Sequence, residues 1–131
     1  MKNPEALRGK KILVVDDDSA TNLLLLSILE SVGMEVTVTT EGIAALDELS
    51  NEVFDIILLD VIMPHMLGID CAKIIRDNDK YKHIPIIFIT GCLEDSSIMQ
   101  LMPIIGVQDI LIKPFRALEL ISRIELWIGR Q

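Results

Sequence analysis

The sequence is poor in aromatic residues, cysteine and basic residues. Aromatic side chains make up 4% of the 131 residues, so a hydrophobic core has to be built mainly from Ile, Leu, Val and Met. The two cysteines, Cys71 and Cys92, lack the spacing of metal ligands and are typical of reduced thiols in a reducing compartment. Asp and Glu outnumber Lys and Arg by 20 to 12, which gives a formal net charge of -8. Such an acidic chain repels phosphate backbones, and we expect no direct binding to nucleic acid.

The chain also lacks long hydrophobic runs. Its N-terminus, from Met1 to Glu5, has no apolar stretch of the kind found in signal peptides. No run approaches the ~18 apolar residues that a membrane span needs, so we expect a cytoplasmic protein without membrane association. Half of the residues are nonetheless hydrophobic, which suits a sizeable core in a chain of single-domain length. We expect an N-terminal extension over residues 1–10 and one domain over residues 11–131.

Apolar strand patterns alternate with helix patterns along the chain. The patterns predict strands over Lys11–Val15, Glu35–Thr39, Asp55–Leu59, Ile84–Ile89 and Asp109–Ile112. They predict helices over Ser19–Val32, Glu41–Leu49, Ile69–Arg76, Asp95–Met102 and Ala117–Ile128. Buried strands separated by helices predict an α/β fold, with a five-stranded parallel sheet and helices on both faces. In the flavodoxin-like strand order 2-1-3-4-5, the ligand-binding switch point lies between strands 1 and 3.

Local patterns set further expectations for the helices. Ser19 is predicted to cap the first helix, and Pro103 and Gly106 are predicted to end the fourth helix after about Met102. In the short second helix we expect the inward residues to be Ile43, Ala44, Leu46 and Leu49. In the last helix we expect the inward stripe to be Leu118, Ile121, Ile124 and Ile128, with Leu120 and Trp127 on its flank.

Four of the strand patterns end in polar residues. Asp16 and Asp17 follow the first strand, Asp60 the third, Thr90 the fourth and Lys113 the fifth. Because the carboxyl ends of parallel strands meet at one edge of a sheet, these side chains should gather at the switch point. Carboxylate oxygens are the ligands that Mg²⁺ prefers. Phosphoryl transfer needs mainly positioning and charge stabilisation, which a metal ion, a hydroxyl and an ammonium group supply.

Simpler roles exist for each of these residues. The acidic run from Asp16 to Asp18 is also compatible with a helix N-terminus, where the macrodipole favours negative charge. Asp18 in particular suits a surface or capping role better than that of a ligand. Thr90 is also compatible with a plain β-branched strand residue, and Lys113 with a solvated surface lysine. The presence of Asp60 at the same predicted edge favours a functional site over these alternatives.

From Lys11 to Gly129 the sequence resembles the receiver domain of two-component response regulators, including those of chemotaxis. The motifs behind this resemblance are Ile12-Leu13-Val14-Val15-Asp16-Asp17, Leu59-Asp60-Val61-Ile62-Met63-Pro64, Gly68, Phe88-Ile89-Thr90-Gly91 and Lys113-Pro114-Phe115. Each motif alone is weakly specific. Together, in this order and at predicted strand ends, they are highly specific for the family.

The resemblance implies a role for each strand-end residue. Asp60 would be the phosphoacceptor, with Thr90 and Lys113 contacting the phosphoryl group. Mg²⁺ or Mn²⁺ would be held by Asp17, Asp60 and the backbone carbonyl of Ile62, and by Asp16 through a metal-bound water. The Lys113–Pro114 bond would be cis. The chemistry would be self-catalysed phosphotransfer and autodephosphorylation, and not turnover of an external substrate by an enzyme.

The sequence departs from the family pattern at several places. An aspartate commonly precedes the glycine in the loop after the phosphoacceptor, whereas here Leu67 precedes Gly68. An aromatic residue three positions before the lysine commonly reports phosphorylation together with the hydroxyl residue, whereas here that position is Ile110. Thr90 and Ile110 are therefore the expected switch positions, and a rotamer change at residue 110 is not expected to be the main reporter of phosphorylation.

Receiver domains also imply partners. The phosphodonor would be a histidine kinase or a histidine phosphotransfer protein, which usually meets the first helix. The face formed by the fourth helix, fifth strand and fifth helix would serve a homodimer or an output domain. Exposed apolar residues in the run Leu23 to Leu26 and around Trp127 are candidates for such contacts.

Two other functions remain open from the sequence. A degenerate receiver would act only as a phosphorylation-independent docking module, and Ile110 is the best support for it. A phosphohydrolase similar to the haloacid dehalogenases would use Asp16 as nucleophile and would not need Asp60. Such an enzyme would want a late acidic pair and a cap for its substrates, and the sequence has neither.

Overall fold

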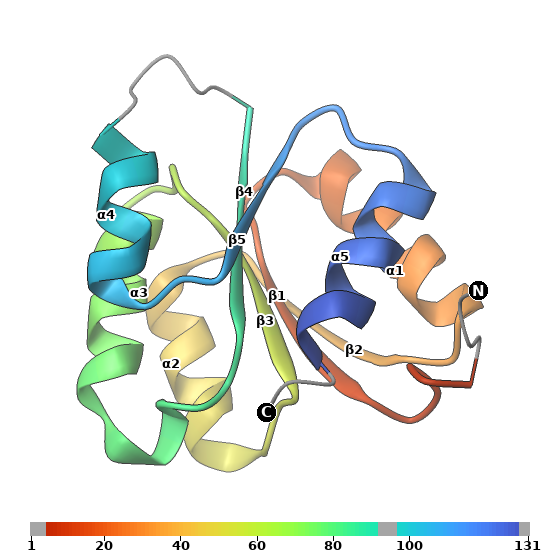
Figure 1. Ribbon diagram of the computed structural model, residues 1–131, viewed down its shortest axis with the longest axis horizontal. Coiled ribbons are helices and arrows are strands. Elements are labelled where there is room, and N and C mark those ends of the chain that lie inside the picture. The colour runs from red at the N-terminus through yellow and green to blue at the C-terminus, as the bar shows by residue number, and fades with distance from the viewer. Residues whose placement is uncertain (1–4, 92–96, 129–131) are drawn as a thin grey trace.

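The computed structural model describes residues 5–91 and 97–128. They form one central sheet with helices on both of its faces (Figure 1). The strands are β1 Lys11–Val15, β2 Glu35–Thr39, β3 Ile56–Asp60, β4 Ile86–Thr90 and β5 Asp109–Ile112. The helices are α1 Ser19–Ser31, α2 Gly42–Asn51, α3 Gly68–Asp77, α4 Ser97–Ile105 and α5 Ala117–Ile128, with a short 3-10 helix, η1, over Asp79–Tyr81. The predicted alternation of strands and helices is therefore confirmed.

The sheet is parallel throughout, in the order β2-β1-β3-β4-β5, which confirms the predicted flavodoxin-like topology. Alternate residues of a strand point to opposite faces. Leu13 and Val15 of β1 pack in the core under α2, α3 and α4, whereas Ile12 and Val14 pack under α1 and α5 (Figure 1). Because both faces of β3 and β4 are covered, their sequences are continuous apolar runs and not alternating ones.

The segment before β1 contributes to the core on the α1 and α5 side. Leu7 is only 2% exposed and belongs to the same hydrophobic cluster as the inward residues of α1 and α5. The Gly9 amide donates to the Gly33 carbonyl at 2.8 Å, which ties this segment to the turn between α1 and β2. Among the helices that the structure describes, none is both long and apolar enough to span a membrane.

Two predicted helix boundaries are wrong. The cap of α1 is Asp18 and not Ser19, because the Asp18 side chain accepts a hydrogen bond from the Thr21 amide. Helix α4 continues past Pro103 to Ile105. It ends where Gly106 takes a φ of 95° and the Gly106 amide donates to the Met102 carbonyl. A proline removes only one amide donor, so tertiary packing of this helix outweighs that loss. The predicted start at Asp95 lies outside the described residues.

The predicted inward faces of α2 and α5 are only partly right. In α2, Ala45 and Leu49 are buried, whereas Ile43 and Ala44 face solvent. In α5 the buried stripe is Leu120, Ile124 and Ile128, and Leu118 is 66% exposed. Both helices offer two overlapping apolar stripes at helical spacing, and only the direction of approach to the sheet decides between them.

One polar side chain organises the end of the molecule away from the predicted site. Arg76, at the end of α3, donates to the carbonyls of Gly106, Tyr81 and Ile84 and to the Gln108 side chain, at 2.6 to 3.2 Å. These acceptors belong to the α4–β5 loop, to η1 and to the approach to β4. Arg76 therefore fixes the C-terminal end of α4 against α3.

Candidate functional site

The polar residues at the strand ends come together as predicted. Asp60 and Thr90 are the last residues of β3 and β4, while Asp16 and Asp17 directly follow β1. Carboxylate oxygens of Asp16, Asp17 and Asp60 lie within 4.8 Å of one another. Asp16 and Asp60 are buried, and Asp17 is exposed. The cluster therefore has two carboxylates inside the fold and one at its opening.

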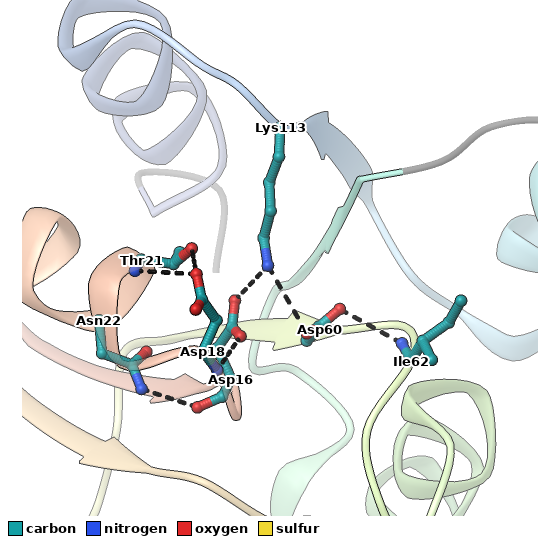
Figure 2. Close-up of polar contacts among 7 residues, drawn as sticks. All are labelled: Asp16, Asp18, Thr21, Asn22, Asp60, Ile62 and Lys113. Atoms are coloured by element: carbon teal, nitrogen blue, oxygen red, sulfur yellow. Dashed lines mark hydrogen bonds and ion pairs between the residues drawn. The ribbon is translucent and has the colours of Figure 1, made fainter.

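Lys113, which follows β5, places its ammonium group between two of these carboxylates (Figure 2). Its Nζ lies 2.8 Å from Oδ2 of Asp16 and 3.6 Å from Oδ2 of Asp60. The Lys113–Pro114 peptide bond is cis, as the resemblance implied. Lys113 is thus an ion-pair partner of the acidic cluster, and the alternative of a solvated surface lysine is excluded.

Burial and neighbouring charges shift the pKa values of Asp60 and Lys113. Burial, and next the charge of Asp16, raise the pKa of Asp60 from 3.8 to about 6, against the opposing effects of Lys113 and the Ile62 amide. Burial alone would lower the pKa of Lys113, but hydrogen bonding to Asp16 and the charges of Asp16, Asp60 and Asp18 raise it instead. The site therefore disfavours the ionised Asp60 and holds Lys113 in its charged form.

The turn between β1 and α1 is held by its own polar groups. Oδ1 of Asp16 accepts from the Asp18 amide at 2.9 Å, and the Asp18 side chain caps α1 through the Thr21 amide. Asp18 is therefore a capping residue, as expected. The Asn22 side chain, in the first turn of α1, donates to the Asp16 carbonyl at 2.7 Å (Figure 2). Asn22 could not be predicted from the sequence, because a helical asparagine gives no signal of its contact with a strand end.

The loop after Asp60 runs close to the end of β3. The Ile62 amide donates to Oδ1 of Asp60 at 3.2 Å, and the Gly68 amide donates to the Val61 carbonyl at 2.7 Å. A Cβ on residue 68 would lie 2.1 Å from the carbonyl oxygen of Asp60, so only glycine fits there. Gly68 therefore lets α3 begin directly against the end of β3.

The two expected switch positions lie on neighbouring strands. Thr90 is 1% exposed at the end of β4, and its carbonyl accepts from the Lys113 amide at 2.8 Å. Ile110 of β5 is in register with Phe88 and packs against the core under α2, α3 and α4. Ile110 is thus a partly buried aliphatic residue at the edge of the core. Cys92, a candidate for the mouth of the site, lies outside the described residues.

A small groove borders the acidic cluster on the α1 side. It has a volume of about 350 Å³, and its lining residues are Ala20, Thr21, Leu24, Lys113, Pro114 and Phe115. Leu23 and Leu24 of α1 are both exposed, which confirms that part of the leucine run faces outwards. The groove thus joins an apolar surface of α1 to the ammonium-bearing loop of the site.

The arrangement of sheet, acidic cluster and strand-end lysine defines a receiver domain. Over residues 12–125 the chain matches the family model of the response regulator receiver domain, and it belongs to that family. The CpxR homolog of Haemophilus influenzae, a transcriptional regulatory protein, is 39% identical over 120 residues, which are 92% of this chain and 51% of that protein. The chain therefore spans about half the length of this relative.

Two solved structures show the same fold. The receiver domain of the sensor histidine kinase PA1611 from Pseudomonas aeruginosa, with a magnesium ion coordinated in its active site cleft, has a TM-score of 0.84 and 31% identity. The match covers 92% of this chain and 98% of that chain. The chemotaxis protein CheY4 of Vibrio cholerae has a TM-score of 0.86 and 29% identity, covering 91% of this chain and 98% of that chain. The resemblance derived from the sequence is confirmed.

Proposed function

We propose that this receiver domain accepts a phosphoryl group on Asp60, with Mg²⁺ as cofactor. The observation that best supports the proposal is the gathering of Asp16, Asp17 and Asp60 within 4.8 Å at the switch point of the sheet, beside the Lys113 ammonium group. Asp60 is the member of the cluster that lies at the end of β3, and its Oδ2 atom is 3.6 Å from the Lys113 Nζ.

The residues present fit a hard divalent cation. Three carboxylates crowd together with one ammonium group, and burial together with the charge of Asp16 raises the pKa of Asp60 to about 6. Asp17, Asp60 and the Ile62 carbonyl would hold the ion, with Asp16 at greater distance, since oxygen ligands suit Mg²⁺. A bound Mg²⁺ would neutralise the oxygens of the phosphodonor and so reduce their repulsion by the carboxylates.

In the proposed transfer, a carboxylate oxygen of Asp60 attacks the phosphorus atom of a phosphohistidine. The new bond is O–P, and the broken bond is N–P, whose electron pair returns to the imidazole nitrogen. Lys113 supplies a fixed positive charge for the phosphoryl oxygens, and the Thr90 hydroxyl supplies a hydrogen bond. Transfer of this kind needs positioning and charge stabilisation more than covalent help from the protein.

The proposed phosphodonor is a histidine kinase or a histidine phosphotransfer protein. The groove beside the site suits such a partner, because it places an apolar surface of α1 next to Lys113. The exposed Leu23 and Leu24 extend this surface. A helix carrying a histidine could pack on these leucines while its imidazole reached Asp60.

The proposed output surface is the face of α4, β5 and α5. Exposed apolar residues on this face are Met99, Ile104, Ile112, Leu118 and Leu126. A polar network joins β5 to α5, since Arg123 and Trp127 both donate to Asp109 at 2.8 to 2.9 Å. Phosphorylation would bias this face between two states by differential binding energy, and a homodimer or an output domain would read the bias.

Mass spectrometry after treatment with phosphoramidate tests the proposal. We expect one added phosphoryl group, mapped to Asp60, when Mg²⁺ is present, and none in EDTA. Asp60→Asn should abolish the modification, and Lys113→Ala should slow it. Asp18→Asn is the matched control, because it removes a neighbouring charge but keeps a capping side chain.

The same experiment separates the alternatives. A phosphoryl group on Asp16 would indicate chemistry like that of the haloacid dehalogenases. A folded protein that binds Mg²⁺ but gains no phosphoryl group from any donor would indicate a docking module. Labelling in EDTA at the full rate would contradict the role given to the metal.

A further inference from the structure

The position of Asp17 is fixed from its two neighbours, and both are held by one residue, Asn22, one through its side chain and the other through its backbone. Nδ2 of Asn22 donates to the carbonyl of Asp16 at 2.7 Å (Figure 2). The backbone amide of Asn22 donates to the carbonyl of Asp18 at 3.0 Å. These two carbonyls flank Asp17 in the chain. Asn22 is only 8% exposed, so both contacts lie inside the fold.

Asp17 itself has no other anchor in the part of the chain that the structure describes. Its side chain is exposed and makes no hydrogen bond or ion pair with another described residue. Asp16 is held by Lys113 and by the Asp18 amide, and Asp60 by the Ile62 amide. The direction of the Asp17 carboxylate therefore depends on its backbone, and Asn22 holds that backbone through hydrogen bonds to the residues on either side.

Packing in the core does not by itself explain the side-chain amide of Asn22. Its Oδ1 atom is buried and has no hydrogen-bond partner among the described residues. Burying an unpaired polar atom is unfavourable, so an apolar side chain of similar shape would suit this place in the core better. The one favourable contact of the amide is the donation to Asp16.

We propose that Asn22 is a positioning residue that holds the β1–α1 turn so that Asp17 faces Asp16 and Asp60 as a ligand of the divalent cation. The inference rests on the proposed function, in which Asp17 binds the metal. Groups behind a metal ligand commonly change metal affinity by about 10- to 100-fold when they are removed. Asn22 would act in this way through the backbone of its neighbours.

Titration of Mg²⁺ by NMR on Asn22→Leu tests the inference. We expect an affinity lower by about tenfold or more. Stability without metal should change little, because loss of the unpaired oxygen is favourable whereas loss of the hydrogen bond to the Asp16 carbonyl is unfavourable. Asn22→Ala provides a second variant that keeps the helix, since alanine is the best helix former.

Thr39→Val is the matched control. Thr39 is also 8% exposed, and its hydroxyl donates to the Val14 carbonyl of β1 at 3.3 Å, so the variant removes a comparable contact near the same strand end. We expect wild-type affinity for Mg²⁺ in Thr39→Val. Wild-type affinity in the folded Asn22 variants would overturn the inference, as would an equal loss in Thr39→Val. If the wild-type protein bound no Mg²⁺, that result would contradict the proposed function itself, and the role of Asn22 together with it.

Discussion

Replacing Asp60 by asparagine should stabilise the protein in the absence of metal. The Asp60 side chain is buried beside Asp16, and its ionised form is disfavoured there, so its pKa rises from 3.8 to about 6. Asparagine has nearly the same shape but no charge. It can still accept a hydrogen bond from the Ile62 amide, and Lys113 keeps its shorter ion pair with Asp16.

The magnitude follows from the pKa. A rise from 3.8 to about 6 corresponds to at most about 3 kcal/mol, at ~1.4 kcal/mol per unit. Because the cluster opens to solvent at Asp17, we expect about 2 kcal/mol. The folded state binds the Asp60 proton more tightly than the unfolded state. The contribution of Asp60 to stability is therefore greatest below about pH 4, falls as the pH rises to about 6, and stays low above that value.

Urea denaturation in metal-free buffer measures this effect, with the fluorescence of Trp127, the single tryptophan, as the signal. At about pH 8 the midpoint of Asp60→Asn should lie roughly 1 M above that of the wild type. At about pH 4 the two midpoints should converge, because both proteins then carry a neutral group at residue 60. Added Mg²⁺ should stabilise the wild type more than the variant. Equal midpoints at about pH 8, or a less stable variant, would refute the electrostatic reasoning.

Two further substitutions test the packing around the site. Gly68→Ala places a Cβ 2.1 Å from the Asp60 carbonyl oxygen, so we expect a loss of about 2 kcal/mol or more in urea denaturation. Gly91→Ala is its control, because a Cβ there meets no atom within 4 Å in the part of the chain that the structure describes, and its effect should stay within about 0.5 kcal/mol. A Gly68→Ala variant as stable as Gly91→Ala would contradict the close approach. Arg76→Met removes four hydrogen bonds and should cost about 3 kcal/mol. Faster hydrogen exchange at the Gly106 amide would report the loosened loop, and unchanged exchange would contradict the role given to Arg76.

The sequence was sufficient to predict the acidic cluster, because a parallel sheet brings all carboxyl ends of its strands to one edge. Asp16, Asp17 and Asp60 follow apolar runs, so their place in the fold depends only on strand order. Lys113 was predictable for the same reason. Its ion pairs with Asp16 and Asp60, by contrast, depend on the direction of its side chain after β5.

The parts that sequence reasoning missed depend on tertiary contacts. The inward face of α5 was misassigned, because Leu118 and Leu120 are both apolar at helical spacing and only the packing of α5 on the sheet selects Leu120. Asn22 and Arg76 gave no signal, since each bonds to backbone carbonyls that no residue pattern identifies. Helix α4 continues beyond Pro103, whereas the sequence predicted an earlier end. The burial of Ile98 and Met102 stabilises this helix, and that burial depends on tertiary packing that a sequence pattern does not reveal.

The proposed switch has to act through the ends of β4 and β5 together. The Lys113 amide donates to the Thr90 carbonyl at 2.8 Å, so the two residues that would grip a phosphoryl group are joined to each other. The Lys113 Nζ is closer to Asp16 than to Asp60, at 2.8 against 3.6 Å, and a phosphoryl group on Asp60 would draw it away from Asp16. Ile110 has no polar group to follow that movement and packs, partly buried, against the core cluster that includes Ile98 and Met102 of α4. Movement of the joined strand ends would therefore reach the output face through the backbone next to α4, and not through a side-chain rotation at Ile110.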